Sequence, residues 1–191
     1  AVLELVKTSA NLLLSGVIII IFVTCFNSSY ILGLIYTDYL EAIEPFQFLM
    51  LGFFPICMNF IFGTLLTANG NLKALNIISL GGIIANICIN LVLIPTHGAL
   101  GAAIATFFTQ LVTAILQYIY CVLKFKIPIK ILGALKFCVL VSGLFMVSHY
   151  FQSSSYLILL QLSVGFVLTF SMALIDLNSM KKLYFSSGRI K

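Results

Sequence analysis

Long apolar runs, separated by short polar or charged segments, divide this chain into six stretches that are each near the length of a membrane helix. The runs cover residues 11–26, 45–67, 74–95, 98–125, 131–150 and 155–175. About 20 helical residues cross the ~30 Å of hydrocarbon in a bilayer. Because lipid cannot satisfy free backbone groups, we expect each run to be a helix. The pattern predicts an all-α, polytopic transmembrane bundle of six spans, with a break at 27–29 and an interfacial turn over 31–36.

The junction between the third and fourth runs is the most specific local pattern. Pro95 and Gly98 mark a tight turn between two apolar helices. Small residues follow it at helical spacing, which lets a helix backbone lie close to a neighbour. The expected packing residues are Gly98, Gly101, Ala102 and Ala105. The simplest neighbour for this part of the fourth run is the third run.

Polar side chains recur at helical spacing on the second, third and fourth runs. In a membrane bundle such faces turn toward other helices or toward a water-filled cavity. The candidates to line a cavity are Asn59, Asn76, Asn86, Asn90, Thr106, Gln110, Thr113 and Gln117. For any one of them packing is the more common role, whereas for the stripes taken together cavity lining and packing are equal alternatives. Pro55, inside the second run, is a candidate hinge. The last two runs carry few amides, which favours a peripheral, lipid-facing pair.

Composition and charge agree with a bilayer environment. Of 191 residues, 62% are hydrophobic and only 8% are charged, so a soluble fold is excluded. With six spans, all ten Lys and Arg residues fall on one side of the membrane, which predicts that both ends of this segment are cytoplasmic. The net charge of +5 therefore reflects orientation, and we expect no nucleic-acid partner. The five cysteines lie in separate apolar runs and are expected to be buried hydrophobes.

The sequence contains no set of residues typical of catalysis. It has no Ser/His/Asp cluster, no P-loop, no nucleotide fingerprint and no spacing typical of metal ligands. We therefore expect no enzymatic activity, no cofactor and no bound metal. Any transport must be driven by a gradient or by another protein.

Three stretches, residues 34–42, 66–73 and 86–106, resemble the polysaccharide flippase branch of the multidrug/oligosaccharidyl-lipid/polysaccharide exporter superfamily. The resemblance implies a fragment of a larger two-lobed transporter, covering about helices nine to fourteen. Residues 1–126 would form most of the C-terminal lobe in four spans, and residues 127–191 an additional peripheral helix pair with a basic cytoplasmic tail. The missing N-terminal half of the same chain would then be a partner.

The same resemblance implies a function in the bacterial inner membrane. The cargo would be an isoprenoid-pyrophosphate-linked oligosaccharide, flipped by alternating access for surface polysaccharide biosynthesis such as that of O-antigen and lipopolysaccharide. The polysaccharide polymerase machinery is a further candidate partner. Two alternatives remain open. A multidrug/cation antiporter of the same superfamily would favour a membrane-embedded Asp or Glu, and a membrane scaffold subunit without cargo predicts polar stripes that neighbouring helices occupy fully.

Overall fold

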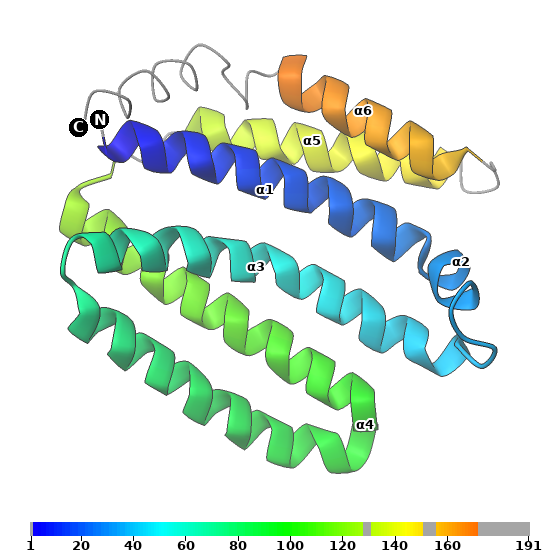
Figure 1. Ribbon diagram of the computed structural model, residues 1–191, viewed down its shortest axis with the longest axis horizontal. Coiled ribbons are helices and arrows are strands. Elements are labelled where there is room, and N and C mark those ends of the chain that lie inside the picture. The colour runs from blue at the N-terminus through cyan, green and yellow to red at the C-terminus, as the bar shows by residue number, and fades with distance from the viewer. Residues whose placement is uncertain (1, 128–130, 151–155, 172–191) are drawn as a thin grey trace, which may run out of the picture. The chain divides into compact units, whose positions relative to one another are not determined.

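A computed structural model describes residues 2–127, 131–150 and 156–171. The described residues are almost entirely helical and contain no strand. The elements in chain order are α1 (Val2–Phe26), α2 (Ser28–Gly33), the 3₁₀ turn η1 (Leu40–Ala42), α3 (Ile43–Ala68), α4 (Leu72–Phe125), α5 (Ile131–Tyr150) and α6 (Leu157–Ser171) (Figure 1). The expected all-α class is therefore confirmed for this part of the chain.

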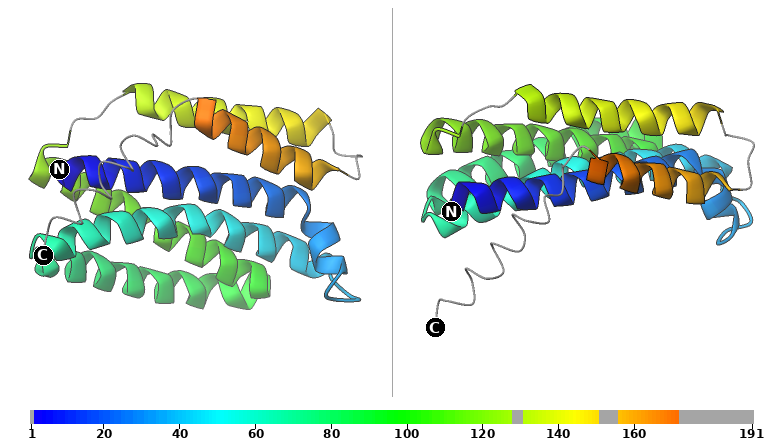
Figure 2. Two further views of the ribbon diagram at one scale, coloured as in Figure 1. Left: turned by 45° about the horizontal axis from the view of Figure 1, so that its top comes forward. Right: turned by 90° about the horizontal axis from the view of Figure 1, so that it is seen from above.

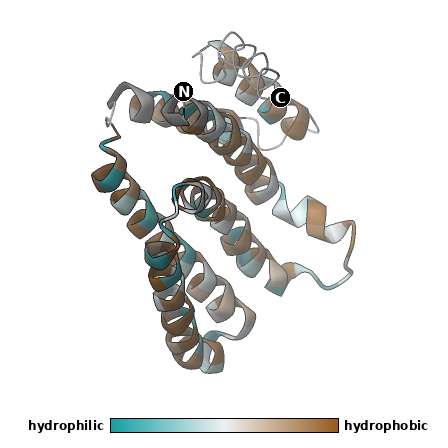
Figure 3. Ribbon diagram, turned by 60° about the vertical axis from the view of Figure 1, so that its left-hand side comes forward, coloured by the Kyte–Doolittle hydropathy of each residue, from teal (hydrophilic) through white to brown (hydrophobic). Residues whose placement is uncertain are grey.

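Several of these helices are suited to a bilayer. Three helical stretches are long and apolar enough to cross it, namely Val6–Phe26, Leu40–Ala68 and Leu72–Phe125, and two shorter apolar helices cover Leu135–Tyr150 and Leu157–Ser171. Hydrophobic residues predominate along the helices in Figure 3, and many large apolar side chains are exposed, such as Phe60, Leu91 and Leu123. A surface of this kind is stable in hydrocarbon and would be costly in water. The described part of the chain is thus all-helical, and its apolar helices suit membrane association.

Helix α4 contains two of the six runs expected from the sequence. Its 54 residues would extend about 80 Å if straight, more than twice the thickness of the hydrocarbon core. Instead α4 doubles back on itself, as Figure 1 shows. The reversal is centred on Gly98, whose φ of 53° and ψ of −128° are not helical. Only glycine adopts such angles without strain, since it lacks a Cβ atom. The residues on either side, Pro95 included, stay in the helical assignment.

Most ends of the other helices lie within a few residues of the predicted bounds, and the start of α1 is an exception. Helix α1 begins well before residue 11, at Val2, and ends at Phe26 as predicted. After a single turn residue the chain becomes helical again, with the Ile31 N–H donating to the Asn27 carbonyl at 2.9 Å. The expected turn over 31–36 therefore starts as part of α2, because local i to i−4 bonds already satisfy its backbone. The predicted ends of the sixth run, residues 155 and 172–175, lie outside the described residues.

The chain divides into two compact units. One comprises residues 20–129, with α3 and both arms of α4, and the other comprises the described parts of 1–19 and 130–191. The sequence suggested a division at 126/127; the structure groups the first part of α1 with α5 and α6. In the first unit, α3 lies against both arms of α4 in each view of Figure 2. Its buried core includes Leu65, Leu66, Ala105, Ala114 and Cys121.

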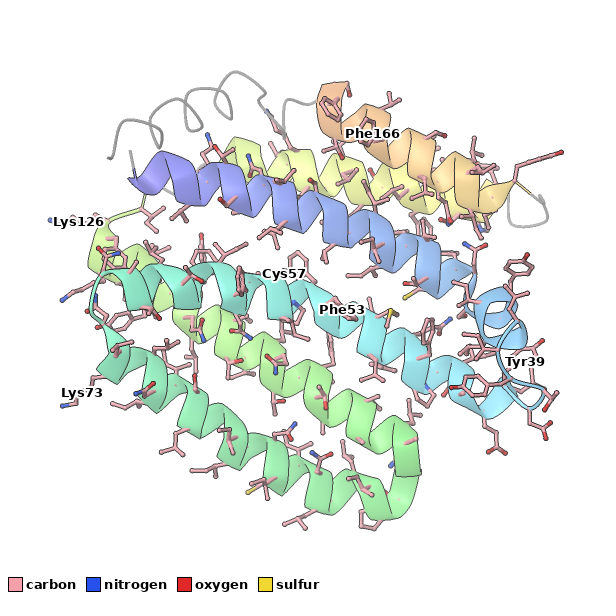
Figure 4. The ribbon with its side chains drawn as sticks, in the orientation of Figure 1. Tyr39, Phe53, Cys57, Lys73, Lys126 and Phe166 are labelled. Carbon is pink, nitrogen blue, oxygen red and sulfur yellow. The ribbon has the colours of Figure 1, made fainter. Side chains whose placement is uncertain are left out.

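Charged residues mark the two ends of the unit formed by residues 20–129. Lys73, at the start of α4, and Lys126, just after its end, lie at the same end of this unit in Figure 4. Tyr39 lies at the opposite end, in the loop that also carries Asp38 and Glu41. The reversal of α4 at Gly98 is what returns the chain to the end that carries Lys73.

Candidate functional site

Helix α3 and the two arms of α4 together line a cavity of about 400 Å³. This volume lies within the range of pockets that bind small ligands. The lining combines amides, hydroxyls, one glycine and two isoleucines, and none of its side chains is charged at neutral pH. The lining residues are Asn59, Ser79, Gly82, Ile83, Asn86, Ile87, Thr106, Thr109, Gln110, Thr113 and Gln117.

The cavity brings together most of the cavity-lining candidates from the sequence. Those that line it are Asn59, Asn86, Thr106, Gln110, Thr113 and Gln117. Asn76 is exposed and lies outside the cavity lining, and Asn90 contacts the cavity only through its bond to Asn86. Ser79 and Thr109 belong to the same polar stripes but were not among the candidates. Gly82 also lines the cavity but could not be predicted from a polar side chain, because its place there depends on how closely the two arms of α4 approach.

Asn59 connects α3 to the second arm of α4. Its Nδ2 donates to the Gln110 Oε1 at 2.8 Å, to the Gln110 carbonyl at 3.2 Å and to the Thr113 Oγ1 at 3.1 Å. Thr113 in turn donates from Oγ1 to the Gln110 carbonyl at 2.9 Å and the Thr109 carbonyl at 3.0 Å. Because all three partners of Asn59 Nδ2 are acceptors, the orientation of this amide is set by its surroundings.

A second chain of hydrogen bonds joins the two arms of α4. Asn90 Nδ2 donates to Asn86 Oδ1 at 2.9 Å, and Asn86 Nδ2 donates to Thr109 Oγ1 at 3.0 Å. The Thr109 hydroxyl donates in turn to the Ala105 carbonyl at 2.8 Å. The bond from Asn86 to Thr109 is the one in this series that crosses between the arms, and each residue of the series donates to the next.

Three buried side-chain oxygens are left without a partner among the described residues. They are Asn59 Oδ1, Asn90 Oδ1 and Gln117 Oε1. Gln117 is only 4% exposed, and both it and Asn59 line the cavity. An unsatisfied buried polar group costs about 1–3 kcal/mol. All three atoms are acceptors with almost no accessible surface, so their neighbours enclose them without donating a bond to them.

The small residues after the turn differ in how tightly they pack. Gly101 is buried, and a Cβ atom there would overlap the backbone carbonyl of Leu93 on the first arm. Ala105 is also fully buried, whereas Ala102 is half-buried and Gly98 has open space beside it. Gly98 therefore supplies the turn, and Gly101 supplies the close approach between the arms.

Another tight contact lies within the cavity wall and was not expected from the sequence. A Cβ atom on Gly82 would overlap the Thr113 methyl group across the two arms. The adjacent Gly81 has nothing within 4 Å of its Cβ position. Of the two neighbouring glycines, Gly82 faces the second arm and is packed against it, whereas Gly81 does not contact it.

Pro55 is fully buried inside α3, which is assigned as one continuous helix from Ile43 to Ala68. Its missing N–H leaves the Leu51 carbonyl without the usual intrahelical donor. The labelled side chains of Phe53 and Cys57 flank this turn of α3 in Figure 4. The hinge role of Pro55 stays a prediction.

Two polar contacts involve glutamines that the sequence did not single out. Gln47 of α3 donates from Nε2 to the Cys25 carbonyl at 3.1 Å and to Ser28 Oγ at 3.0 Å. These bonds satisfy the chain where α1 ends and α2 begins. Between α5 and α6, the buried Gln161 Nε2 donates to the buried Ser148 Oγ at 2.8 Å.

Helix α6 has one packed face, which qualifies the lipid-facing pair expected from the sequence. Leu157, Gln161, Gly165 and Thr169 are buried at intervals of four residues. Gly165 lies so close to Ile19 of α1 that an added Cβ atom would overlap its side chain. The outer residues Leu159, Phe166 and Val167 remain exposed. Only one side of α6 is therefore available to lipid, because the other side packs on helices of its own unit.

No protein-family model matches the chain, and comparisons with curated proteins and with solved structures found no match.

Proposed function

We propose that this chain is part of a two-lobed bacterial inner-membrane transporter that flips an isoprenoid-pyrophosphate-linked oligosaccharide by alternating access. The observation that carries the proposal is the uncharged polar cavity between α3 and the two arms of α4. Polar surface inside a bundle of apolar helices is costly unless it serves packing or cargo. Here part of that surface lines open space of about 400 Å³ among the described residues, as expected for a site with a transient occupant.

The proposal includes six spans with both ends of the segment cytoplasmic. Each arm of α4 is long enough for one span, since each exceeds the ~20 residues that a bilayer requires. The common end of Lys73 and Lys126 would face the cytoplasm, and the acidic loop around Tyr39 would face the outside. The shorter helices α5 and α6 would complete the count.

The cavity also bears on the alternatives. A scaffold subunit predicts polar stripes that neighbouring helices fill, which fits poorly with a cavity of about 400 Å³ and with unpaired oxygens. A cation-coupled antiporter favours an acidic side chain in the cavity, and the lining has none. The uncharged lining fits a flippase whose contacts with the pyrophosphate lie elsewhere.

The test is deletion of the gene from its host, with the chain and its Gln110→Leu variant supplied in trans. Gln110 accepts a bond from Asn59 across the cavity, so the variant should reduce transport while the folded protein is still produced. The measurement is the fraction of lipid-linked oligosaccharide exposed on the outer leaflet, followed by the amount of surface polysaccharide. Ser163→Leu, on the exposed side of α6, is the matched control. Unchanged outer-leaflet cargo in the deletion strain would refute the proposal.

A further inference from the structure

We propose that residues 30–40 form a lipid-contacting segment, which inserts into the headgroup region of the bilayer and meets zwitterionic phospholipids there. The segment comprises the end of α2, the loop that follows it and the first residue of η1. The inference is independent of the cargo. It follows from apolar side chains that are held outward, from the helices on either side of the segment, and from the charges beside it.

Large apolar side chains are concentrated on the outside of this segment. Each of them is more than half exposed, from 59% for Tyr36 to 74% for Leu40, and the others are Tyr30, Leu34 and Ile35. Single exposed apolar residues are common on folded proteins. Five within such a short segment form a patch instead, and a patch of this kind marks contact with a membrane or with another protein.

Helix α2 is held so that an apolar side faces outward. Ser28 and Leu32 lie one turn apart and are buried. Tyr30 and Leu34 are also one turn apart, on roughly the opposite side of the helix, and both are exposed. Gln47 of α3 donates from Nε2 to Ser28 Oγ at 3.0 Å. This contact fixes how α2 is turned, so the exposure of its apolar side is set by α3 and not by a loose helix end.

Local contacts also hold the loop after α2 in one conformation. The N–H groups of Ile35 and Tyr36 both donate to the Leu32 carbonyl, at 3.0 and 2.9 Å. The Tyr39 ring lies beside Gly33, with its Cε1 atom 3.2 Å from the position that a Cβ atom would take there. Figure 4 shows Tyr39 in this loop, at the end of the unit opposite to Lys73. The apolar side chains are thus presented on an ordered backbone, which lowers the entropy lost when they enter lipid.

The helices on either side identify the membrane, and not a second protein, as the partner of this patch. Helix α1 ends at Phe26 and α3 begins at Ile43, and each includes a stretch long and apolar enough to cross a bilayer. With both helices in the bilayer, the residues that join them lie at one membrane surface, at the level of the headgroups. Tyrosine is enriched at this level because its ring is apolar and its hydroxyl is polar. The exposed tyrosines of the segment, Tyr30 and Tyr36, fit that environment.

Acidic residues beside the patch indicate which headgroups it meets. Asp38, Glu41 and Glu44 are exposed. The sequence has no Lys or Arg between Lys7 and Lys73 that could offset their charge. Anionic headgroups would therefore repel this part of the chain. Zwitterionic headgroups carry a positive ammonium group that a carboxylate can approach, so we assign the segment to lipids of this class.

The experiment uses tryptophan fluorescence of the full chain in phosphatidylcholine nanodiscs, because the chain has no tryptophan of its own. Tyr36→Trp reports on the loop, and Tyr30→Trp repeats the measurement from α2. Phe53→Trp is the deep reference, since Phe53 is exposed and lies about 15 Å along α3 from its start. Free N-acetyltryptophanamide is the aqueous reference. The quenchers are lipid brominated near the headgroup end of its acyl chain, lipid brominated near the far end, and acrylamide in the water.

We expect Tyr36→Trp and Tyr30→Trp to be quenched most strongly by the bromine near the headgroup, and Phe53→Trp by the bromine at the far end of the chain. Replacing part of the phosphatidylcholine with anionic phosphatidylglycerol should lower the lipid quenching of Tyr36→Trp and leave that of Phe53→Trp unchanged.

Three results would overturn the inference. Acrylamide quenching equal to that of the aqueous reference, with none by brominated lipid, would place the segment in water. Protection of both tyrosine positions from all three quenchers would assign the patch to a protein partner such as a second copy of this chain. Strongest quenching by the far-end bromine would place the segment in the hydrocarbon core. Quenching of Tyr36→Trp that stays unchanged or grows in anionic lipid would refute the assignment to zwitterionic headgroups.

Discussion

The contact between Gly101 and Leu93 yields a quantitative prediction about folding. Replacing Gly101 with Ala would push a methyl group into the Leu93 backbone carbonyl. A backbone group cannot rotate away as a side chain can, and the turn at Gly98 holds both arms of α4 together. Overpacking of this kind costs about 1–3 kcal/mol, and the helical preference of Ala over Gly returns about 0.5–1 kcal/mol. Because the overlapping group is backbone, the overpacking cost should lie in the upper part of its range, at about 2–3 kcal/mol, which leaves a net destabilisation of about 1–2.5 kcal/mol.

Gly81 provides the matched control on the same helix. Its Cβ position has nothing within 4 Å, so Gly81→Ala should show only the helical gain. For a chain of this size, 1 kcal/mol moves the melting temperature by about 2–4 °C. Gly101→Ala should therefore melt about 2–10 °C below the unmodified protein, and Gly81→Ala should melt slightly above it.

Thermal unfolding in detergent can be monitored with a thiol-reactive dye, because the chain has five cysteines and no tryptophan. Cys88 and Cys138 are exposed and are replaced by alanine for this assay, whereas Cys121 is fully buried and should become reactive only on unfolding. If Gly101→Ala melts at or above the temperature of Gly81→Ala, the two arms of α4 do not meet at Gly101. The bundle geometry described for residues 20–129 would then be wrong.

Two further predictions concern the α5–α6 pair and the orientation of the chain. A double-mutant cycle with Ser148→Ala and Gln161→Leu should give a coupling energy of about 0.6 kcal/mol and at most about 1.7 kcal/mol, as for interhelical bonds in membranes; additive effects would show that the bond contributes nothing. In a cysteine-free background, a membrane-impermeant thiol reagent added outside intact cells should label His97→Cys and leave Lys126→Cys unlabelled. The reverse result would invert the proposed topology.

Local sequence was sufficient for the helical class and for most helix positions. Apolar runs near 20 residues leave the backbone no partner except itself, so helices follow without any knowledge of the neighbours. The reversal after the third run was predicted for a similar reason, since Gly98 can adopt a positive φ that other residues rarely adopt. The short helix α2 was missed because residues 27–36 show no helical periodicity of apolar residues. Its hydrogen bonds are local and begin immediately after the turn, with the Ile31 N–H donating to the Asn27 carbonyl.

The sequence by itself therefore determined that this chain is helical, apolar and striped with amides. Only the tertiary structure decided which amides share a cavity, because that depends on how two arms and α3 rotate about their axes. The same stripe contains Asn86, which lines the cavity, and Asn76, which is exposed. Spacing at 3.6 residues per turn cannot separate them, since it specifies a face of the helix and not where along that face a partner lies. That the oxygens of Asn59 and Gln117 are buried without a hydrogen-bond donor is likewise decided by neighbouring helices that are distant in sequence.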